Sequence, residues 1–170
     1  MNISTALIDK HDHQRRRVLA GIAVLCASPL VAWAATGTGP MMEVWKDPSC
    51  GCCKDWIDHL SKNGFAMKVH ETGNTAMRKE LGMPDRYGSC HTARVGGYVI
   101  EGHVPAREIH RLLKEKRTAL GLAVPGMPIG SPGMDGPEYG PRKDAYDVLL
   151  VKRDGGATVY QSYAGAKPRT

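Results

Sequence analysis

The chain has 170 residues, of which 24% are charged and 42% hydrophobic, and its formal net charge is +6. This length suits one domain with a modest core. The basic residues are scattered among acidic ones, which excludes a continuous nucleic-acid-binding stripe and predicts an ordinary solvated surface.

The first 34 residues have the pattern of a secretory signal peptide. Arginines at 15–17 precede an apolar run over 18–31, and Ala32-Trp33-Ala34 is a small-x-small cleavage pattern. The order Arg15-Arg16-x-Val18-Leu19 also resembles a twin-arginine signal, so both export routes stay open. We predict cleavage near Ala34, a periplasmic protein, and no membrane span in the mature chain.

A short flexible lead-in is predicted at 35–41, followed by a domain at 42–117 with alternating strand and helix patterns. The predicted strands are 42–46, 65–70, 90–95 and 98–101, and the predicted helices are 50–63, 74–81 and 105–116. Gly64 stands where a C-terminal cap belongs, and Pro105 suits the first position of a helix. The order is β-α-β-α-β-β-α, which belongs to the α/β class.

Residues 118–170 are predicted to form a C-terminal extension. Residues 121–141 are rich in Gly, Pro and Met, a composition that excludes a long helix or a central strand. Residues 146–152 and 158–163 are predicted to close the chain as a β-hairpin. A loop this long in a compact domain is usually functional, so we expect the extension to pack on the site.

Cysteine spacing is the most informative chemical feature. Of five cysteines, Cys26 lies in the predicted signal peptide, and three others fall within Cys50-Gly51-Cys52-Cys53. Adjacent cysteines form strained bridges, so this spacing favours a ligand cluster over structural disulfides. The predicted helix start favours thiolate, the form that binds metal or attacks a disulfide. A redox disulfide between Cys50 and Cys53 stays open as the alternative.

The element order resembles a minimal thioredoxin or glutaredoxin domain, in which a Cys-x-x-Cys motif lies between the first strand and the first helix. In such domains a cis-proline precedes the strand that enters the hairpin, and its loop packs against the motif. Here Cys90 and His91 occupy that place, and His103 follows the hairpin on the same side. The resemblance therefore implies that these three residues lie beside the other thiols. The missing proline argues against ordinary disulfide exchange.

Four motifs in the same order are similar to those of the CopG-type family of periplasmic copper-resistance proteins. They are Pro48-x-Cys-Gly-Cys-Cys, Ser89-Cys-His-Thr, Glu101-Gly-His-Val-Pro and Pro125-Gly-Met-Pro-x-Gly-Ser-Pro-Gly-Met134. The resemblance implies a thioredoxin-like fold and copper binding in the cell envelope. It also implies a cluster of several copper ions and interconversion of Cu(I) and Cu(II).

Ligand chemistry also favours copper. Thiolate and thioether groups select Cu(I), whereas imidazole tolerates Cu(II). The predicted metal ligands are Cys50, Cys52, Cys53, Cys90, His91, His103, Met127 and Met134. Plainer roles stay open for some of them: a packed thiol for Cys52, hydrogen bonding for the histidines, and packing over the domain's open face for the methionines.

The sequence thus predicts a copper-binding protein of copper resistance or homeostasis, and it leaves open whether the protein is a copper oxidoreductase. Two other functions remain. One is a thiol–disulfide oxidoreductase that uses Cys50 and Cys53. The other is a metallochaperone that hands copper to an efflux system or a cuproprotein.

Overall fold

The computed structural model describes residues 39–166. The predicted signal peptide and residues 35–38 of the predicted lead-in lie outside this range. Among the described residues, no helix is long and apolar enough to cross a membrane.

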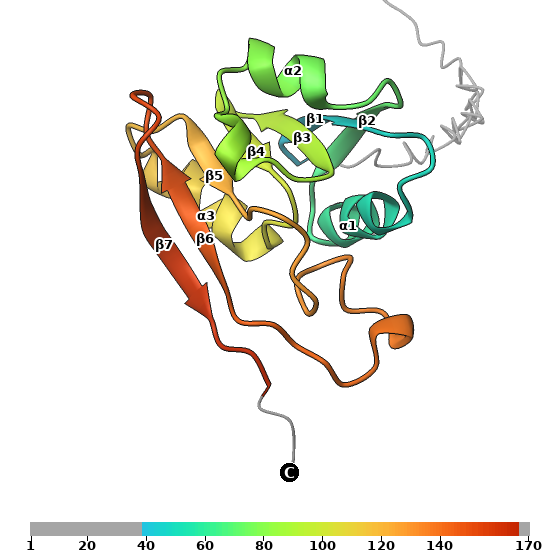
Figure 1. Cartoon of the computed structure of the whole chain (residues 1–170). Coiled ribbons are helices and arrows are strands. Elements are labelled where there is room, and N and C mark those ends of the chain that lie inside the picture. Colours follow the sequence, from blue (N-terminus) through green and yellow to red (C-terminus); the bar gives the residue numbers. More distant parts are fainter. Residues whose placement is uncertain (1–38, 167–170) are drawn as a thin grey trace, which may run out of the picture. The chain divides into compact units, whose positions relative to one another are not determined.

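The strands of the described chain form one seven-stranded sheet in the order β2-β1-β3-β4-β5-β6-β7 (Figure 1). The strands are β1 (Met41–Lys46), β2 (Ala66–His70), β3 (His91–Val95), β4 (Tyr98–Glu101), β5 (Gly121–Ala123), β6 (Tyr146–Val151) and β7 (Ala157–Tyr163). The helices are α1 (Gly51–Lys62), α2 (Thr75–Glu80) and α3 (Ala106–Glu115), with short 3-10 turns η1 (Asp85–Tyr87) and η2 (Pro137–Tyr139).

Helices α1 and α3 cover one face of the sheet. Trp56 and Leu60 of α1 and Ile109 and Leu112 of α3 fall at helical spacing and join the main hydrophobic core. The buried indole N–H of Trp56 donates to the carbonyl oxygen of Val104, 2.9 Å away. This bond ties α1 to the segment that leads into α3.

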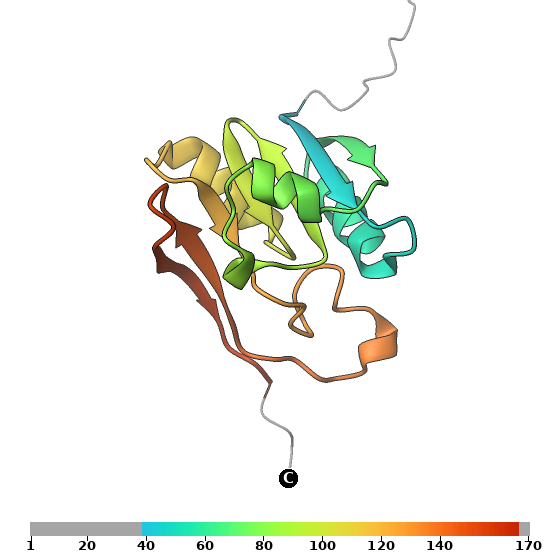
Figure 2. The same cartoon turned by 45° about the horizontal axis from the view of Figure 1, so that its top comes forward.

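The segment that carries α2 and η1 covers the opposite face (Figure 2). Side chains alternate along β4, so Ile100 enters the main core while Val99 packs with Met83 in a second, smaller cluster. The strands near the middle of the sheet are therefore buried on both faces, as expected of a sheet with helices on each side.

The predicted mixed α/β class is confirmed. Strand β1 pairs in parallel with β2 and antiparallel with β3, and β3 pairs antiparallel with β4. These pairings place the four predicted strands of the first part of the chain side by side in one sheet. The predicted closing hairpin also forms, as β6 and β7.

The prediction that 121–141 holds no central strand is wrong at its start. Strand β5 lies inside the sheet, parallel to β4 and antiparallel to β6. It ends at Ala123, before Pro125, so no proline interrupts its hydrogen bonding. Gly121 allows this pairing, because a side chain there would collide with the backbone of Val99. The extension thus continues the sheet of the first four strands.

Candidate metal centre

The site lies where the β1–α1 loop meets the start of β3. Cys50 is the N-cap of α1, and Cys52 and Cys53 lie in the first turn of that helix. Cys90 directly precedes β3, whose first residue, His91, pairs with Lys46 at the end of β1. Strand pairing therefore brings Cys90 beside the helix that carries the other cysteines.

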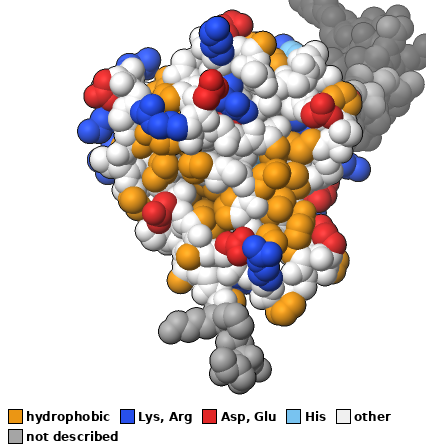
Figure 3. Space-filling model, viewed as in Figure 1, with side chains coloured by type: hydrophobic (Ala, Val, Ile, Leu, Met, Phe, Trp, Pro, Cys, Tyr) orange, Lys and Arg blue, Asp and Glu red, His pale blue; other side chains and the backbone are white. Residues whose placement is uncertain are grey.

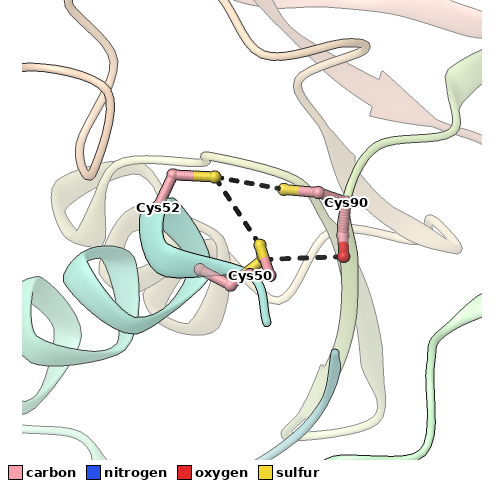
Figure 4. Close-up of side chains that lie close together, drawn as sticks. Cys50, Cys52 and Cys90 are labelled. Atoms are coloured by element: carbon pink, nitrogen blue, oxygen red, sulfur yellow. Dashed lines mark hydrogen bonds between the residues drawn. A yellow bond between two sulfur atoms is a disulfide. The ribbon is translucent and has the colours of Figure 1, made fainter. Parts of the chain in front are cut away.

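Four sulfur atoms gather within 4.8 Å of one another. The Sγ atom of Cys52 lies 3.6 Å from Sγ of Cys50 and 3.9 Å from Sγ of Cys90 (Figure 4). The Sγ atom of Cys53 lies 3.6 Å from the carbonyl oxygen of Cys90. Cys53 is buried, and the other three cysteines are partly exposed. The structure thus brings the four cysteines predicted as ligands together.

Cys50 and Cys53 are joined by a disulfide, which is the state that the sequence left open as the alternative to four free thiols. Their Cα atoms are 5.4 Å apart, because one helical turn brings positions three residues apart close together, and this separation suits a bridge. Cys52 and Cys90 remain free thiols. A disulfide has no thiolate to give a metal, so binding by all four sulfurs requires its prior two-electron reduction.

Two buried histidines converge on Cys90. Nδ1 of His91 lies 3.4 Å from Sγ of Cys90, and Nε2 of His103 lies 3.1 Å from it. The other ring nitrogens face carbonyl oxygens: Nε2 of His91 is 3.0 Å from Gly102 O, and Nδ1 of His103 is 2.8 Å from Pro132 O. A carbonyl only accepts, so each ring carries its hydrogen on that side and aims its lone pair at Cys90.

Electrostatics keeps these groups uncharged at neutral pH. Burial lowers the pKa of His91 well below its ordinary value, with His103 adding to the effect, and burial also lowers the pKa of His103. Burial raises the pKa of the Cys90 thiol to about 12, with the neighbouring Cys52 adding to the shift. The single S–H of Cys90 can satisfy one imidazole lone pair and leaves the other without this donor. An excess of lone pairs around one sulfur is the electronic arrangement that suits a cation.

The Gly/Pro/Met-rich loop between β5 and β6 packs against this cluster. Pro132 supplies the carbonyl that holds His103. A Cβ atom at Gly133 would lie 2.6 Å from the carbonyl oxygen of Cys52 and 2.7 Å from the backbone nitrogen of Trp56, so only glycine permits this approach to α1. Figure 3, in the view of Figure 1, shows hydrophobic side chains gathered on the face where the loop lies.

The two predicted methionine ligands differ in their surroundings. Met134 is buried, and its sulfur accepts a hydrogen bond from the Tyr139 hydroxyl at 3.4 Å. Met127 keeps 51% of its surface exposed and lies outside the buried cluster. Six of the eight predicted ligands therefore gather in one place, while the role of the thioethers stays a prediction.

The buried polar residues that bind the backbone next to Cys90 were not identified from the sequence. Glu101, at the end of β4, is fully buried and bonds to Arg78 and to the backbone of Ser89. A charged residue at an inward position of an apolar strand was the available signal.

The comparisons agree with the copper-resistance resemblance. Residues 87–134 match the family described as "Protein of unknown function, DUF411", and no curated protein matches the chain. A solved structure described as "Copper resistance protein copG- Form 2" is 46% identical, with a TM-score of 0.68, over 74% of this chain and 99% of that chain. Form 1 of the same protein is 47% identical, with a TM-score of 0.67, over 72% of this chain and 96% of that chain. At this identity and coverage, the chain belongs to the CopG family of copper-resistance proteins.

Proposed function

We propose that this protein is exported to the periplasm and binds copper there, in copper resistance. The carrying observation is the convergence of two buried imidazole lone pairs and three further sulfur atoms on the Cys90 sulfur. Such a set offers ligands to a soft metal, because reduced Cys50, Cys52 and Cys53 would add thiolates to the sulfur and nitrogen donors already present.

The donor set divides into two groups that share one atom. Cys90 belongs both to the group of four cysteines and to the group formed with His91 and His103. The sulfur-only group suits Cu(I), and the mixed group accepts Cu(I) or Cu(II). A thiolate at Cys90 would be available to both groups, which supports binding of more than one copper ion. Met134 and Met127 are candidate outer ligands from the loop.

Interconversion of Cu(I) and Cu(II) is the proposed activity. When the reduced Cys50 and Cys53 form their disulfide, they release two electrons and two protons. Those electrons reduce two Cu(II) ions to two Cu(I) ions, so the step balances with copper as the substrate. The remaining thiols and imidazoles keep the product ions bound. Reduction of the disulfide by a thiol reductant resets the site.

Thiol–disulfide exchange is the second candidate, and the Cys50–Cys53 bridge favours it. The bridge lies at the N-terminus of α1, where the helix dipole stabilises a leaving thiolate, and Cys50 is partly exposed. Against it stands the pair Cys90-His91, which is expected to occupy the place of the cis-proline in ordinary exchange enzymes.

Copper titration of residues 35–170 separates the two candidates. Fully reduced protein is titrated with Cu(I) under anaerobic conditions against a chelator, with free thiols counted in parallel. We expect tight binding that blocks thiols only while copper is present. Insulin reduction that is unchanged after Cys90→Ser, together with no copper binding, would establish exchange instead. His110→Asn is the matched control, since His110 bonds to Asn63 O away from the thiols.

A further inference from the structure

The short segment before β3 carries Cys90 and has no proline to fix its path. In a thioredoxin-like arrangement this segment packs against the helix that bears the cysteine motif, and a cis-proline shapes it. Here Cys90 and His91 are in its place, and Sγ of Cys90 nevertheless lies 3.9 Å from Sγ of Cys52. Other groups must hold the backbone at this point.

Glu101 binds the segment from the side of β4. Its carboxylate is fully buried and accepts from Ser89 N at 2.7 Å, from Arg78 Nε at 2.9 Å and from the Thr92 hydroxyl at 2.6 Å. Both carboxylate oxygens are therefore used, and one of them holds the backbone of the residue that precedes Cys90.

Arg78 binds the same residue from the side of α2. While its Nε donates to Glu101, its Nη2 donates to the carbonyl oxygen of Ser89 at 2.7 Å. The side-chain amide of Asn74 donates to that carbonyl at 3.1 Å and to the Thr92 hydroxyl oxygen at 3.3 Å. Both backbone groups of Ser89 are thus fixed by side chains from two different elements.

This arrangement is a costly way to obtain stability alone. A buried ion pair loses hydration that its mutual attraction only partly offsets, and apolar packing of similar volume is often as stable. The planar guanidinium of Arg78 bonds to Glu101 and to Ser89 at once, a geometry that a lysine does not reproduce. The Arg78–Glu101 pair therefore fixes the orientation of the backbone beside the candidate metal centre.

We propose that Arg78 and Glu101 are positioning residues that replace the cis-proline and hold the Cys90 sulfur between Cys52 and the two histidines. The inference rests on the proposed copper site where it is tested by copper affinity. A second test needs only the free thiols Cys52 and Cys90. Neither residue touches the proposed metal. Their effect passes through the Ser89 backbone to Cys90.

The test compares Glu101→Gln and Arg78→Lys with the control Glu108→Gln. Glu108, on α3, is also fully buried. It accepts hydrogen bonds from Arg107 Nε and from the Tyr163 hydroxyl, each at 2.9 Å. Cu(I) affinity is measured by chelator competition and melting temperature by circular dichroism. We expect Glu101→Gln to weaken copper binding about 10- to 100-fold, as loss of an outer-shell partner does, and Arg78→Lys to weaken it less. Glu108→Gln lowers the melting temperature and leaves copper affinity unchanged.

Phenylarsine oxide gives the copper-independent readout, because it bridges two thiols only when their sulfurs are close. In protein with the Cys50–Cys53 disulfide intact, it reports on Cys52 and Cys90. We expect its capture to be slower in Glu101→Gln and Arg78→Lys and unchanged in Glu108→Gln.

Wild-type copper affinity and wild-type arsenical capture in folded Arg78→Lys and Glu101→Gln would overturn the inference. Absence of copper binding in the wild type would overturn the proposed function, and capture of the arsenical would still decide whether Arg78 and Glu101 position Cys90. If Glu101→Gln does not fold, Arg78→Lys and Asn74→Ala decide by the same two readouts.

Discussion

The two halves of the candidate metal centre differ in how ready their donor atoms are for a ligand. On the histidine side, Gly102 and Pro132 carbonyls fix both rings, so the lone pairs face Cys90 before any metal arrives. On the helix side, Cys50 and Cys53 share a covalent bond, and their ligand atoms become available only after reduction. One half is set by folding, and the other is set by the redox state of its surroundings.

Under the proposed function, this difference gives the two halves distinct tasks. The histidine side offers the same donors in either redox state, so it would keep a copper ion while the redox state of the helix side changes. The helix side gains or loses two thiolates together, because they form one disulfide. Cys90 joins the two halves, since its sulfur lies near the histidine nitrogens and near Cys52.

The largest expected effect comes from the redox state of the Cys50–Cys53 pair. Metal-site binding energies of about 10–16 kcal/mol over four ligands correspond to about 5–8 kcal/mol for two, or roughly 10⁴- to 10⁶-fold in affinity. We expect oxidised protein to bind Cu(I) more weakly than reduced protein by this order. The double variant Cys50→Ser/Cys53→Ser should match the oxidised protein under reducing conditions. Equal affinities in the two redox states would show that Cys50 and Cys53 are not ligands, since Cys52 is a free thiol in both states.

Removal of the shared atom should come second. Cys90→Ser deletes one thiolate, worth about 2.5–4 kcal/mol, or roughly 10²- to 10³-fold in Cu(I) affinity. Because both halves lose the same ligand, the copper-to-protein ratio from elemental analysis should also fall. A normal ratio with weaker binding of one ion would mean that Cys90 serves only one half.

Acid should destabilise the fold in part through the two buried histidines of the site. Burial holds the pKa values of His91 and His103 below the ordinary value of 6.5, so the unfolded chain takes up protons first as the pH falls. The free energy of unfolding should therefore drop below pH 6.5, by about 1.4 kcal/mol per pH unit for each histidine.

The measurement is the urea midpoint of the oxidised, metal-free protein between pH 7 and pH 5. His91→Asn should flatten this dependence relative to the wild type. Burial raises the pKa of Glu101, which works in the opposite direction, but this contribution is common to both proteins and cancels in the comparison. An unchanged dependence of the urea midpoint on pH in His91→Asn would show that buried His91 does not cause the loss of stability in acid.

The smallest expected effect concerns the loop that touches both halves. Gly133→Ala places a Cβ atom against the carbonyl oxygen of Cys52 and the backbone nitrogen of Trp56, at a residue whose φ is +81°. This change should lower the free energy of unfolding by about 1–2 kcal/mol. The loop should then lift from α1, and Cys52 should react faster with a thiol reagent. Gly140→Ala, also at positive φ but with open space around it, is the control for backbone strain alone. Equal thiol reactivity in the two variants would mean that the loop does not cover Cys52.

Local patterns explain what could be predicted from the sequence. The spacing of Trp56 and Leu60 and the turn at Gly96-Gly97 depend on neighbouring residues, so α1 and the β3–β4 hairpin were predictable. The expected resemblance to a thioredoxin-like order predicted that Cys90, His91 and His103 lie near the motif, and the structure brings all three there.

Contacts between distant segments explain what could not be predicted. The choice of Gly102 O and Pro132 O as partners of the histidines depends on how two loops meet in space, and no local pattern encodes it. The same holds for β5, which is short and acquires its sheet position from β4 and β6. The bond between Cys50 and Cys53 depends on redox conditions as well as spacing, so the motif fits either state.

The packing of Trp56 on His91 gives this protein a built-in optical signal. Their ring centroids are 4.2 Å apart, and Trp56 is fully buried, so its emission is shielded from solvent quenchers. Copper bound at the neighbouring imidazole would quench this indole far more than Trp45, which stacks on His70. Fluorescence of unlabelled protein, with Trp45→Phe to isolate the signal, would then follow filling of the histidine side in real time.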